Sequence, residues 1–322
     1  MDPKNIQLLV SDDFDSVNQI ILGQLHSDVD LVETISRYLI DSGGKRIRPM
    51  LVLLVARYCG YQGELHTLLA TIIEFLHTAT LLHDDVVDIS QLRRGRPTSN
   101  AVWGNAPSVL VGDFLYSRAF QMMIRIGDMK ILSILAESTN QIAEGEVRQL
   151  THVHNADLTE DEYYEVIKAK TAVLFRAASH TAAVLSSAPN DLEIALKEYG
   201  THLGMTFQLI DDLLDYNGDA EEMGKNVGDD LMEGKVTLPL IYTMQHANQD
   251  DLTMIREAIN KGETKHAERI VQLVKNSGAL AYTQQQAVNE VQKASSLLEN
   301  LPRNRYRDAL NDLLEAAVHR SK

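Results

Sequence analysis

The chain has 322 residues, of which 44% are hydrophobic and 23% are charged, the composition of a globular protein able to bury a sizeable core. Its 30 lysines and arginines against 45 aspartates and glutamates give a formal net charge of −15, which disfavours binding to nucleic acid or anionic lipid. A single cysteine, Cys59, excludes an internal disulfide and fits a reducing compartment.

The first residues, MDPKNIQLLVSDDFD, lack the basic start and apolar run of a signal peptide. No stretch approaches the roughly 18 consecutive apolar residues of a membrane span, so we expect a cytoplasmic protein without one. An amphipathic segment follows at 14–25, FDSVNQIILGQL, which could cover a subunit interface or the chain's own core.

Helical periodicity dominates the rest of the sequence. Proline is absent from 108–188 and 240–301, and apolar residues recur at helical spacing around 75–86 and 203–214, whereas no comparable run alternates with period two. The sequence therefore predicts an all-α fold, built as one domain over 1–322. Gly- and Pro-containing connectors are expected at 41–45, 61–64, 93–107, 186–191, 216–235 and 300–304.

The segment GGKRIRP at 43–49 gathers positive charge. Its glycines let backbone amides approach an anion, Lys45 and Arg48 supply charge, and Pro49 suits the first turn of a helix, whose N-terminus also favours anions. Taken alone, an ordinary turn with solvated charges is the commoner explanation of such a segment.

The segment LLHDDVVD at 81–88 holds the first acidic cluster, Asp84, Asp85 and Asp88. On a helix Asp84 and Asp88 share a face with Asp85 beside them, so the three carboxylates are expected to converge. Arg93 and Arg94 follow where the helix is expected to end, at Gly95. These arginines could lean over a phosphate or complement the helix dipole, and a solvated acidic face explains the cluster equally well.

A second acidic cluster, Asp211, Asp212 and Asp215, lies in QLIDDLLDY at 208–216. With Gln208 it occupies positions i+3, i+4 and i+7 of one helix face, opposite an apolar stripe. Two matching clusters favour a metal site, because clustered carboxylates need compensating cations to stay ionised. Oxygen ligands without histidine or cysteine at zinc spacing favour Mg²⁺, which could clamp a diphosphate between the clusters.

The combination of motifs resembles the trans-isoprenyl diphosphate synthases. It includes GGKRIRP, His77 seven residues before Asp84, DDVVD followed by RRG, "KT" at 170–171, QLIDDLLD, and GKNVGDDLMEGKVTLP at 224–239. These run in order from about residue 40 to about residue 245, and they are most similar to the long-chain bacterial type that makes octaprenyl diphosphate.

This resemblance implies a prenyltransferase that condenses isopentenyl diphosphate head to tail onto an allylic diphosphate, as a homodimer and with two or three Mg²⁺ per site. It implies that the metal ligands are Asp84, Asp85, Asp88, Asp211, Asp212 and Asp215, with Asp84, Asp88 and Asp211 the most direct. It assigns Arg93, Lys170, Lys225 and Lys235 to the allylic diphosphate, Lys45, Arg48, His77 and Arg94 to isopentenyl diphosphate, and Thr171 and Gln208 to the allylic carbons.

Product length should depend on how deep an apolar cavity runs below the first acidic cluster. Short-chain relatives carry aromatic plugs four or five residues before its first aspartate, where this chain has the small Thr80 and Ala79. Leu76 and Met123 are candidates for the deeper wall. We expect Ala79→Tyr to shorten the product, although close helix packing also explains a small residue at 79, and Met123 also fits plain core filling.

Three alternatives remain open at the level of sequence. The same chemistry could end at hexaprenyl, heptaprenyl or decaprenyl diphosphate. A non-catalytic prenyl-binding or regulatory subunit could keep the helical fold, although it has no evident need for six converging carboxylates. The HDD at 83–85 superficially resembles a metal-dependent HD phosphohydrolase, but that class requires further histidine ligands at spacings that the sequence does not offer.

Overall fold

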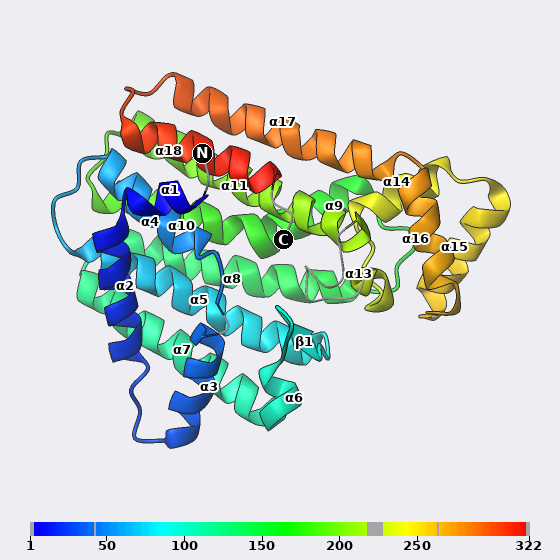
Figure 1. The fold of residues 1–322 in the computed structure, drawn as a ribbon, viewed down its shortest axis with the longest axis horizontal. Coiled ribbons are helices and arrows are strands. Elements are labelled where there is room, and N and C mark those ends of the chain that lie inside the picture. Colours follow the sequence, from blue (N-terminus) through cyan, green and yellow to red (C-terminus); the bar gives the residue numbers. More distant parts are fainter. Residues whose placement is uncertain (1–2, 42, 218–227, 263, 320–322) are drawn as a thin grey trace.

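The computed structural model describes residues 3–41, 43–217, 228–262 and 264–319. Lys225, expected to contact the allylic diphosphate, lies outside the described residues. About 80% of the chain is helical, and the described residues form only one short two-stranded sheet, so the all-α prediction is confirmed. Most of the long helices run roughly along the long axis of the molecule (Figure 1).

The helices and strands of the first half are α1 (Pro3–Leu8), α2 (Ser11–Gln24), α3 (Asp30–Asp41), α4 (Ile47–Tyr58), α5 (Leu65–Val87), β1 (Leu92–Arg93), β2 (Arg96–Pro97), α6 (Ser99–Trp103), α7 (Asn105–Ile126) and α8 (Met129–His152). The second half contains α9 (Glu160–Ile167), the π-helical turn η1 (Lys168–Ala172), α10 (Val173–Leu185), α11 (Asn190–Asn217), α13 (Asp229–Met232), α14 (Leu238–His246), α15 (Gln249–Lys261), the 3₁₀ turn η2 (Thr264–His266), α16 (Ala267–Asn276), α17 (Ala279–Glu299) and α18 (Arg305–Val318).

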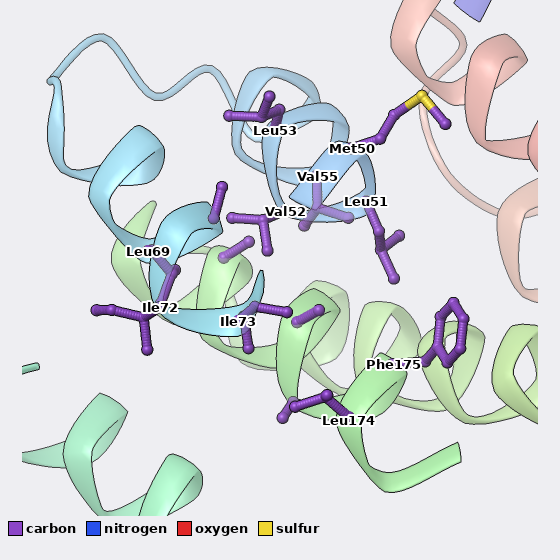
Figure 2. Close-up of a cluster of buried hydrophobic side chains, with 14 of the residues drawn as sticks. Met50, Leu51, Val52, Leu53, Val55, Leu69, Ile72, Ile73, Leu174 and Phe175 are labelled. Carbon is purple, nitrogen blue, oxygen red and sulfur yellow. The ribbon is translucent and has the colours of Figure 1, made fainter. Parts of the chain in front are cut away.

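Helix α5 is the central element of the main core. Figure 2 shows buried side chains of α4, such as Val52 and Leu51, facing those of α5 and α10, including Ile73 and Phe175. By length and composition α5 is apolar enough to cross a membrane, which was not expected from the sequence. However, 72% of its apolar window is buried inside the protein, as expected of the core helix of a globular fold.

A second cluster of buried side chains joins α9, the C-terminal half of α11, and α14 to α17. Helices α11 and α17 supply residues to both clusters, since Leu203 and Ala294 belong to the main core and Leu209 and Ala287 to the second. The two clusters are therefore connected through shared helices, and the acidic end of α11 lies beside the second one.

The amphipathic segment at 14–25 covers the chain's own core. It forms most of α2, whose buried residues are Phe14, Val17 and Ile21, and α2 packs against α5. Of the two explanations that the sequence left open for this segment, burial within the chain is the one that the structure supports.

The predicted end of the α5 helix at Gly95 is wrong. The helix ends at Val87, where Asp88 closes the last turn by donating its N–H to the Asp84 carbonyl at 2.8 Å. The chain then forms an antiparallel hairpin in which Arg93 pairs with Arg96. Arg94 and Gly95 connect the strands with φ angles of 53° and 73°, the left-handed pair that a two-residue type I′ turn requires. The helix itself is terminated upstream of this turn by Ile89, whose φ of 54° is left-handed and after which Ser90 donates its N–H to the Asp85 carbonyl at 3.0 Å.

Helix α11 packs unusually close to α10 and η1, through glycine. A Cβ on Gly204 would lie 2.5 Å from the Cα of Ala172, and one on Gly200 would lie 2.7 Å from the carbonyl oxygen of Phe175. These glycines let α11 bring Gln208 and the second acidic cluster against the π turn. Such π turns inside helices occur often at functional sites.

We predict that Gly204→Ala lowers the free energy of unfolding by about 1–3 kcal/mol, because the methyl group meets backbone that cannot move aside cheaply. Gly23→Ala is the matched control: a Cβ on this helical glycine would meet no atom within 4 Å, so alanine there should stabilise by about 0.5–1 kcal/mol. Urea denaturation measures both. Equal effects of the two substitutions would contradict the close contact of α11 with η1.

Candidate active site

One cavity of about 650 Å³ lies at the centre of the predicted site residues. Its lining comes from α4 and the segment before it, α5, the β1–β2 hairpin, α8, α9, η1, α10, α11, and α13 with the segment after it. The predicted site residues that line it are Lys45, Arg48, His77, Thr80, Asp84, Asp88, Arg93, Arg94, Lys170, Thr171, Gln208, Asp211, Asp212, Asp215 and Lys235. Residues from segments as far apart as 45 and 235 thus share one cavity.

Helix α5 contributes a continuous stripe to this lining. Glu74, His77, Leu81, Asp84 and Asp88 all line the cavity at successive spacings of three or four residues, which places them on one helix face. The stripe leads from basic side chains near Glu74 to the acidic cluster at the end of the helix. A single element therefore sets the distance between the two charged ends of the cavity.

Asp85 does not converge with its two neighbours, contrary to the expectation from the sequence. Its side chain is fully buried outside the cavity lining. Arg93 donates through Nε to its Oδ1 at 2.8 Å, and Nη2 of the same guanidinium forms an ion pair with Oδ1 at 2.7 Å. Because successive helix residues are about 100° apart, Asp85 cannot share the face of Asp84 and Asp88. Its position is that of a buried anchor, which holds Arg93 at the cavity.

Lys235 forms an ion pair across the cavity with a residue that is distant in the sequence. Its Nζ lies 2.7 Å from Oδ2 of Asp88 and 2.7 Å from Oε2 of Glu233. Asp88 and two further carboxylates, Asp230 and Glu233, raise the pKa of Lys235 despite its burial. The lysine therefore stays charged and compensates part of the acidic charge around it.

The second acidic cluster divides into one exposed and two buried carboxylates. Asp211 is exposed at the cavity, whereas Asp212 and Asp215 are 3% and 7% exposed. Both oxygens of Asp212 accept hydrogen bonds, from Tyr163 Oη at 2.5 Å and from Gln208 Nε2 at 2.7 Å. Burial, with Asp230 next in effect, raises the pKa of Asp212 to about 8.

Lys170 projects from the π turn toward α8. Its Nζ donates to Glu146 Oε2 at 2.8 Å and to Gln149 Oε1 at 2.6 Å, and all three residues line the cavity. The next residue, Thr171, donates through Oγ1 to Gln208 Oε1 at 2.8 Å. The π turn thus places a cation and a hydroxyl side by side at the cavity wall.

Arg48 and His77 form the basic end of the cavity. Arg48 Nη1 lies 3.2 Å from His77 Nε2, and its guanidinium stacks 4.3 Å from the ring centroid of Phe175. Because a guanidinium only donates, Nε2 accepts and the His77 proton sits on Nδ1. Burial and the nearby arginine charges hold the pKa of His77 well below its usual range, so His77 offers a neutral N–H donor.

The glycines of GGKRIRP bring Arg94 close to the backbone. A Cβ on Gly44 would lie 2.6 Å from Arg94 Nη1, so a larger residue there displaces the guanidinium. Arg94, Arg48 and Arg46 surround Glu74, whose pKa is raised by burial even though these arginines lower it. This end of the cavity therefore carries several cations around one buried acid.

Several polar residues of the lining were not predicted from the sequence. They are Arg46, Glu74, Glu146, Gln149, His152, Tyr163, Asp230 and Thr237. Glu74 had a usable signal, because it precedes His77 by three residues and continues the face that carries Asp84 and Asp88. Glu146 and Gln149 carried no such signal, since α8 is rich in exposed polar residues and only the packing of η1 selects these two.

Three of the four residues predicted for the chain-length wall lie elsewhere. Thr80 lines the cavity, whereas Leu76, Ala79 and Met123 are not part of its lining and are at most 1% exposed within the main core. The apolar part of the lining includes Ile142, Leu174 and Phe207 instead. The small side chain at 79 thus has a packing explanation, which is one of the two that the sequence left open.

The cavity's donor set fits a hard divalent cation. Within the described ranges no three His, Cys, Asp or Glu side chains are close enough to hold a metal by themselves. Mg²⁺, however, usually keeps waters and completes its shell with substrate phosphates. Burial raises the pKa of Asp84 to about 6, with Glu146 and Asp88 adding to the rise against Lys170 and Arg93. A bound cation would relieve this unfavourable charge.

The histidine beside the first acidic cluster does not support a phosphohydrolase. His83 is not part of the cavity lining; its Nε2 lies 3.2 Å from the carbonyl oxygen of Val109 and 3.4 Å from Asp113. The HDD pattern therefore has no metal-ligand geometry of that class.

A helical bundle whose cavity combines two aspartate-bearing helix ends with lysines and arginines has the donor set of a site for a diphosphate and divalent cations. A family model described as polyprenyl synthetase matches residues 29–276, and the chain belongs to this family. This agrees with the resemblance that the sequence motifs indicated.

Individual relatives match over the whole chain. Octaprenyl diphosphate synthase of Escherichia coli is 50% identical over 323 residues, covering 100% of both chains. An all-trans-nonaprenyl-diphosphate synthase of Rhodobacter capsulatus is 47% identical, covering 97% of this chain and 96% of its own. A crystal structure of a polyprenyl synthase from Caulobacter crescentus, complexed with calcium and isoprenyl diphosphate, aligns with a TM-score of 0.97 at 43% identity over 99% of this chain and 98% of that one.

The adjacent aspartates 84 and 85 should respond oppositely to loss of charge. In metal-free protein at pH 7, Asp84→Asn should raise the free energy of unfolding by up to about 2 kcal/mol, since it removes a carboxylate whose pKa rises to about 6 on folding. Asp85→Asn should lower it by about 2–4 kcal/mol, because it leaves the Arg93 charge without its buried partner.

The direction of the Asp84→Asn effect on the free energy of unfolding follows from proton binding. Folded Asp84 holds its proton up to a higher pH than unfolded Asp84, so stability falls between about pH 4 and pH 6 and stays lower above that range. Thermal and urea unfolding in EDTA measure the effect across this window. Destabilisation of both variants at pH 7 would contradict the different environments of the two carboxylates.

Proposed function

We propose that the protein is a long-chain trans-polyprenyl diphosphate synthase. It condenses isopentenyl diphosphate repeatedly onto an allylic diphosphate, such as farnesyl diphosphate, to give about octaprenyl diphosphate for quinone side chains. The observation that carries the proposal is the shared cavity, in which Asp84 and Asp88 from α5 and Asp211 and Asp215 from α11 meet a set of cationic side chains. Full-length similarity to octaprenyl diphosphate synthase supports the product class.

The acidic side of the cavity takes the allylic diphosphate in this proposal. Asp84, Asp88 and Asp211 would hold the two or three Mg²⁺ that the resemblance implies, and Asp215 and Asp212 would support them from buried positions. Mg²⁺, when bound, neutralises charge on the diphosphate and so makes it a better leaving group. Asp85 acts through Arg93, which it orients by a hydrogen bond and an ion pair.

Cationic side chains receive the charge that develops on the leaving group. Arg93, Lys170 and Lys235 line this side, and Lys225 belongs to the proposal through the family motif alone. Each of the three is paired with an acid or amide, as Lys170 is with Glu146 and Gln149, so it stands preformed at the cavity. Preorganised charge of this kind is usually the largest catalytic contribution in such reactions.

The basic end takes isopentenyl diphosphate. Lys45, Arg48 and Arg94 supply charge, and His77 supplies a neutral N–H. The α5 stripe separates this end from Asp84 by about two helix turns, or roughly 10 Å, so the two diphosphates occupy different places along one helix face.

The chemistry needs no nucleophile from the protein. The allylic C–O bond breaks, and its electron pair leaves with the diphosphate. The double bond of isopentenyl diphosphate then attacks the allylic cation to form the new C–C bond, and the released diphosphate accepts the proton lost as the alkene re-forms. The oxygens of Thr171 and Gln208 stabilise the cation by their dipoles.

We propose further that residues 1–322 act as one domain and that two chains form a homodimer in the cytoplasm. The shared helices α11 and α17 support a single domain. Large apolar side chains left exposed on α7 and α8 support a dimer: Leu110, Ile124, Met129 and Val147 are 61–75% exposed. Sedimentation of the wild type as a 36.0 kDa monomer would contradict the dimer.

The decisive assay measures diphosphate release and chain elongation by the purified chain alone, with Mg²⁺, farnesyl diphosphate and isopentenyl diphosphate. We expect turnover that EDTA abolishes, and a loss of at least about 100-fold in Asp84→Ala. Asp113→Ala is the control, since this carboxylate is exposed outside the cavity. Absence of turnover in the wild type would favour a non-catalytic subunit, and an active Asp84→Ala would refute the metal assignment.

Product length gives a separate prediction. Thr80→Tyr, at a position that lines the cavity, should shorten the product while leaving the first condensations intact. Thr80→Ser is the matched control and should keep the wild-type length. Ala79→Tyr, expected from the sequence to shorten the product, now places a large side chain in the main core and should chiefly destabilise the fold.

Chromatography of labelled products and thermal unfolding would separate these effects. Unchanged product length in Thr80→Tyr would remove Thr80 from the path of the growing chain. A folded Ala79→Tyr with a shortened product would restore the expectation based on sequence. The wild-type product itself decides between octaprenyl diphosphate and the hexaprenyl, heptaprenyl, nonaprenyl or decaprenyl alternatives.

A further inference from the structure

Tyr163 on α9 is a buried tyrosine whose hydroxyl serves a carboxylate of the candidate active site. Its side chain is 3% exposed within the second core cluster, and its Oη lies 2.5 Å from Asp212 Oδ2. Burial and the charge of Asp212 keep the pKa of Tyr163 well above its usual range. The hydroxyl therefore keeps its proton and donates to the carboxylate.

Asp212 in turn is hydrogen-bonded to Gln208. The second carboxylate oxygen, Oδ1, accepts a hydrogen bond from Gln208 Nε2 at 2.7 Å. Because the amide nitrogen can only donate, Oδ1 is the acceptor of this bond, and the bond turns Gln208 Oε1 away from Asp212. The orientation of the Gln208 amide thus depends on where Asp212 points.

Thr171 completes the sequence of bonds. Its Oγ1 donates to Gln208 Oε1 at 2.8 Å, so the Thr171 proton points toward Gln208 and its lone pairs point elsewhere. All four residues line the cavity. Four side chains from α9, η1 and α11 are thereby linked, and the hydrogen bonds are donated toward Asp212 from both sides: by Tyr163 on one side, and by Thr171 through Gln208 on the other.

We propose that Tyr163 is a positioning residue for the prenyl-transfer step. By occupying Oδ2 of Asp212, its hydroxyl keeps the carboxylate turned toward Gln208, and this holds the Gln208 and Thr171 oxygens where the allylic cation develops. The inference deepens the proposed function and rests on it. Tyr163 itself acts through Asp212 and Gln208 rather than by touching the reacting carbons.

Without the hydroxyl, one oxygen of Asp212 loses its donor in a buried place. The carboxylate can then rotate toward another donor or a cation in the cavity, and the Gln208 amide loses its fixed direction. Loss of one partner of a buried hydrogen bond corresponds to roughly a 10- to 100-fold change in an equilibrium or rate. The loss should fall on the step in which positive charge develops on the allylic substrate.

Tyr163→Phe tests this with the ring retained. We expect kcat to fall by about 10- to 100-fold, with little change in KM for isopentenyl diphosphate, whose proposed ligands Arg48 and His77 lie at the other end of the α5 stripe. Tyr164→Phe is the matched control: the neighbouring tyrosine lies on the same helix but outside the cavity lining, and kcat should stay at the wild-type value.

A binding measurement separates positioning from general loss of structure. An aza-analogue of the allylic diphosphate, with a protonated nitrogen in place of the carbon that becomes cationic, should bind Tyr163→Phe more weakly by about the same factor as kcat falls. A thiolodiphosphate analogue, which resists cleavage and carries no positive charge on its prenyl chain, should bind the wild type and Tyr163→Phe equally. Calorimetric titration with each analogue in Mg²⁺ gives the comparison.

Each result has a defined meaning. Equal weakening of both analogues, or wild-type kcat in Tyr163→Phe, would overturn the positioning role. A wild-type protein without prenyl-transfer activity would instead refute the proposed function, so the two failures are distinguishable.

A double variant gives a second test. Thr171→Val combined with Tyr163→Phe should raise the activation free energy by less than the sum of the two separate increases, because both residues act through Gln208. Additive increases would also contradict the inference.

Discussion

Repulsion among carboxylates gathered in one partly buried cavity is the interaction that the remaining structure must balance. Asp84 and Asp88 meet Asp211, Asp212 and Asp215 in a space from which much of the water is excluded. Ionised acids in such a place raise one another's pKa unless cations are near. Burial is the main cause that raises the pKa of Asp84 to about 6; Glu146 and Asp88 add to the rise, and Lys170 and Arg93 oppose it. A site with such unfavourable charge suits a substrate that arrives with divalent cations.

The cations that do compensate come from distant parts of the chain. Lys235 reaches Asp88 from beyond α13, and Arg93 is held by Asp85 on the far side of α5. Lys170 is bound by α8 through Glu146 and Gln149. Each cation is thus tied to a different element, so the charge pattern of the cavity depends on the correct packing of the whole bundle rather than on any one motif.

Close helix packing sets the positions of the neutral polar groups. Gly200 and Gly204 let α11 lie against α10 and the π turn, and the same turn carries Lys170 and Thr171. With these backbones in contact, short side chains such as Thr171 can reach across to Gln208 directly. The arrangement is rigid because side chains from three elements bond in series, and each bond restricts the next.

The predictions from sequence succeeded where a local repeat carries the information. The period of the apolar residues determined the all-α fold, and the spacing of Asp84 and Asp88 on one helix face required no partner element. The same reasoning failed for Asp85, since side-chain direction changes by about 100° per residue and its neighbour Arg93 lies in a hairpin that helical periodicity does not reveal. It also failed to distinguish cavity-facing Thr80 from core-packed Ala79, which are adjacent in the chain.

The amino-acid sequence by itself determined the helical fold, the two acidic clusters, the basic segments and membership of a prenyl synthase family, because each is written in spacings of a few residues. Only the tertiary structure decided which acids face the cavity, which elements hold the lysines and arginines, and that Tyr163, Asp212, Gln208 and Thr171 are bonded in series. The physical reason is that these contacts join residues up to 147 positions apart, as for Lys235 and Asp88. Such pairs meet only after the helices have packed, and no local pattern specifies the partner.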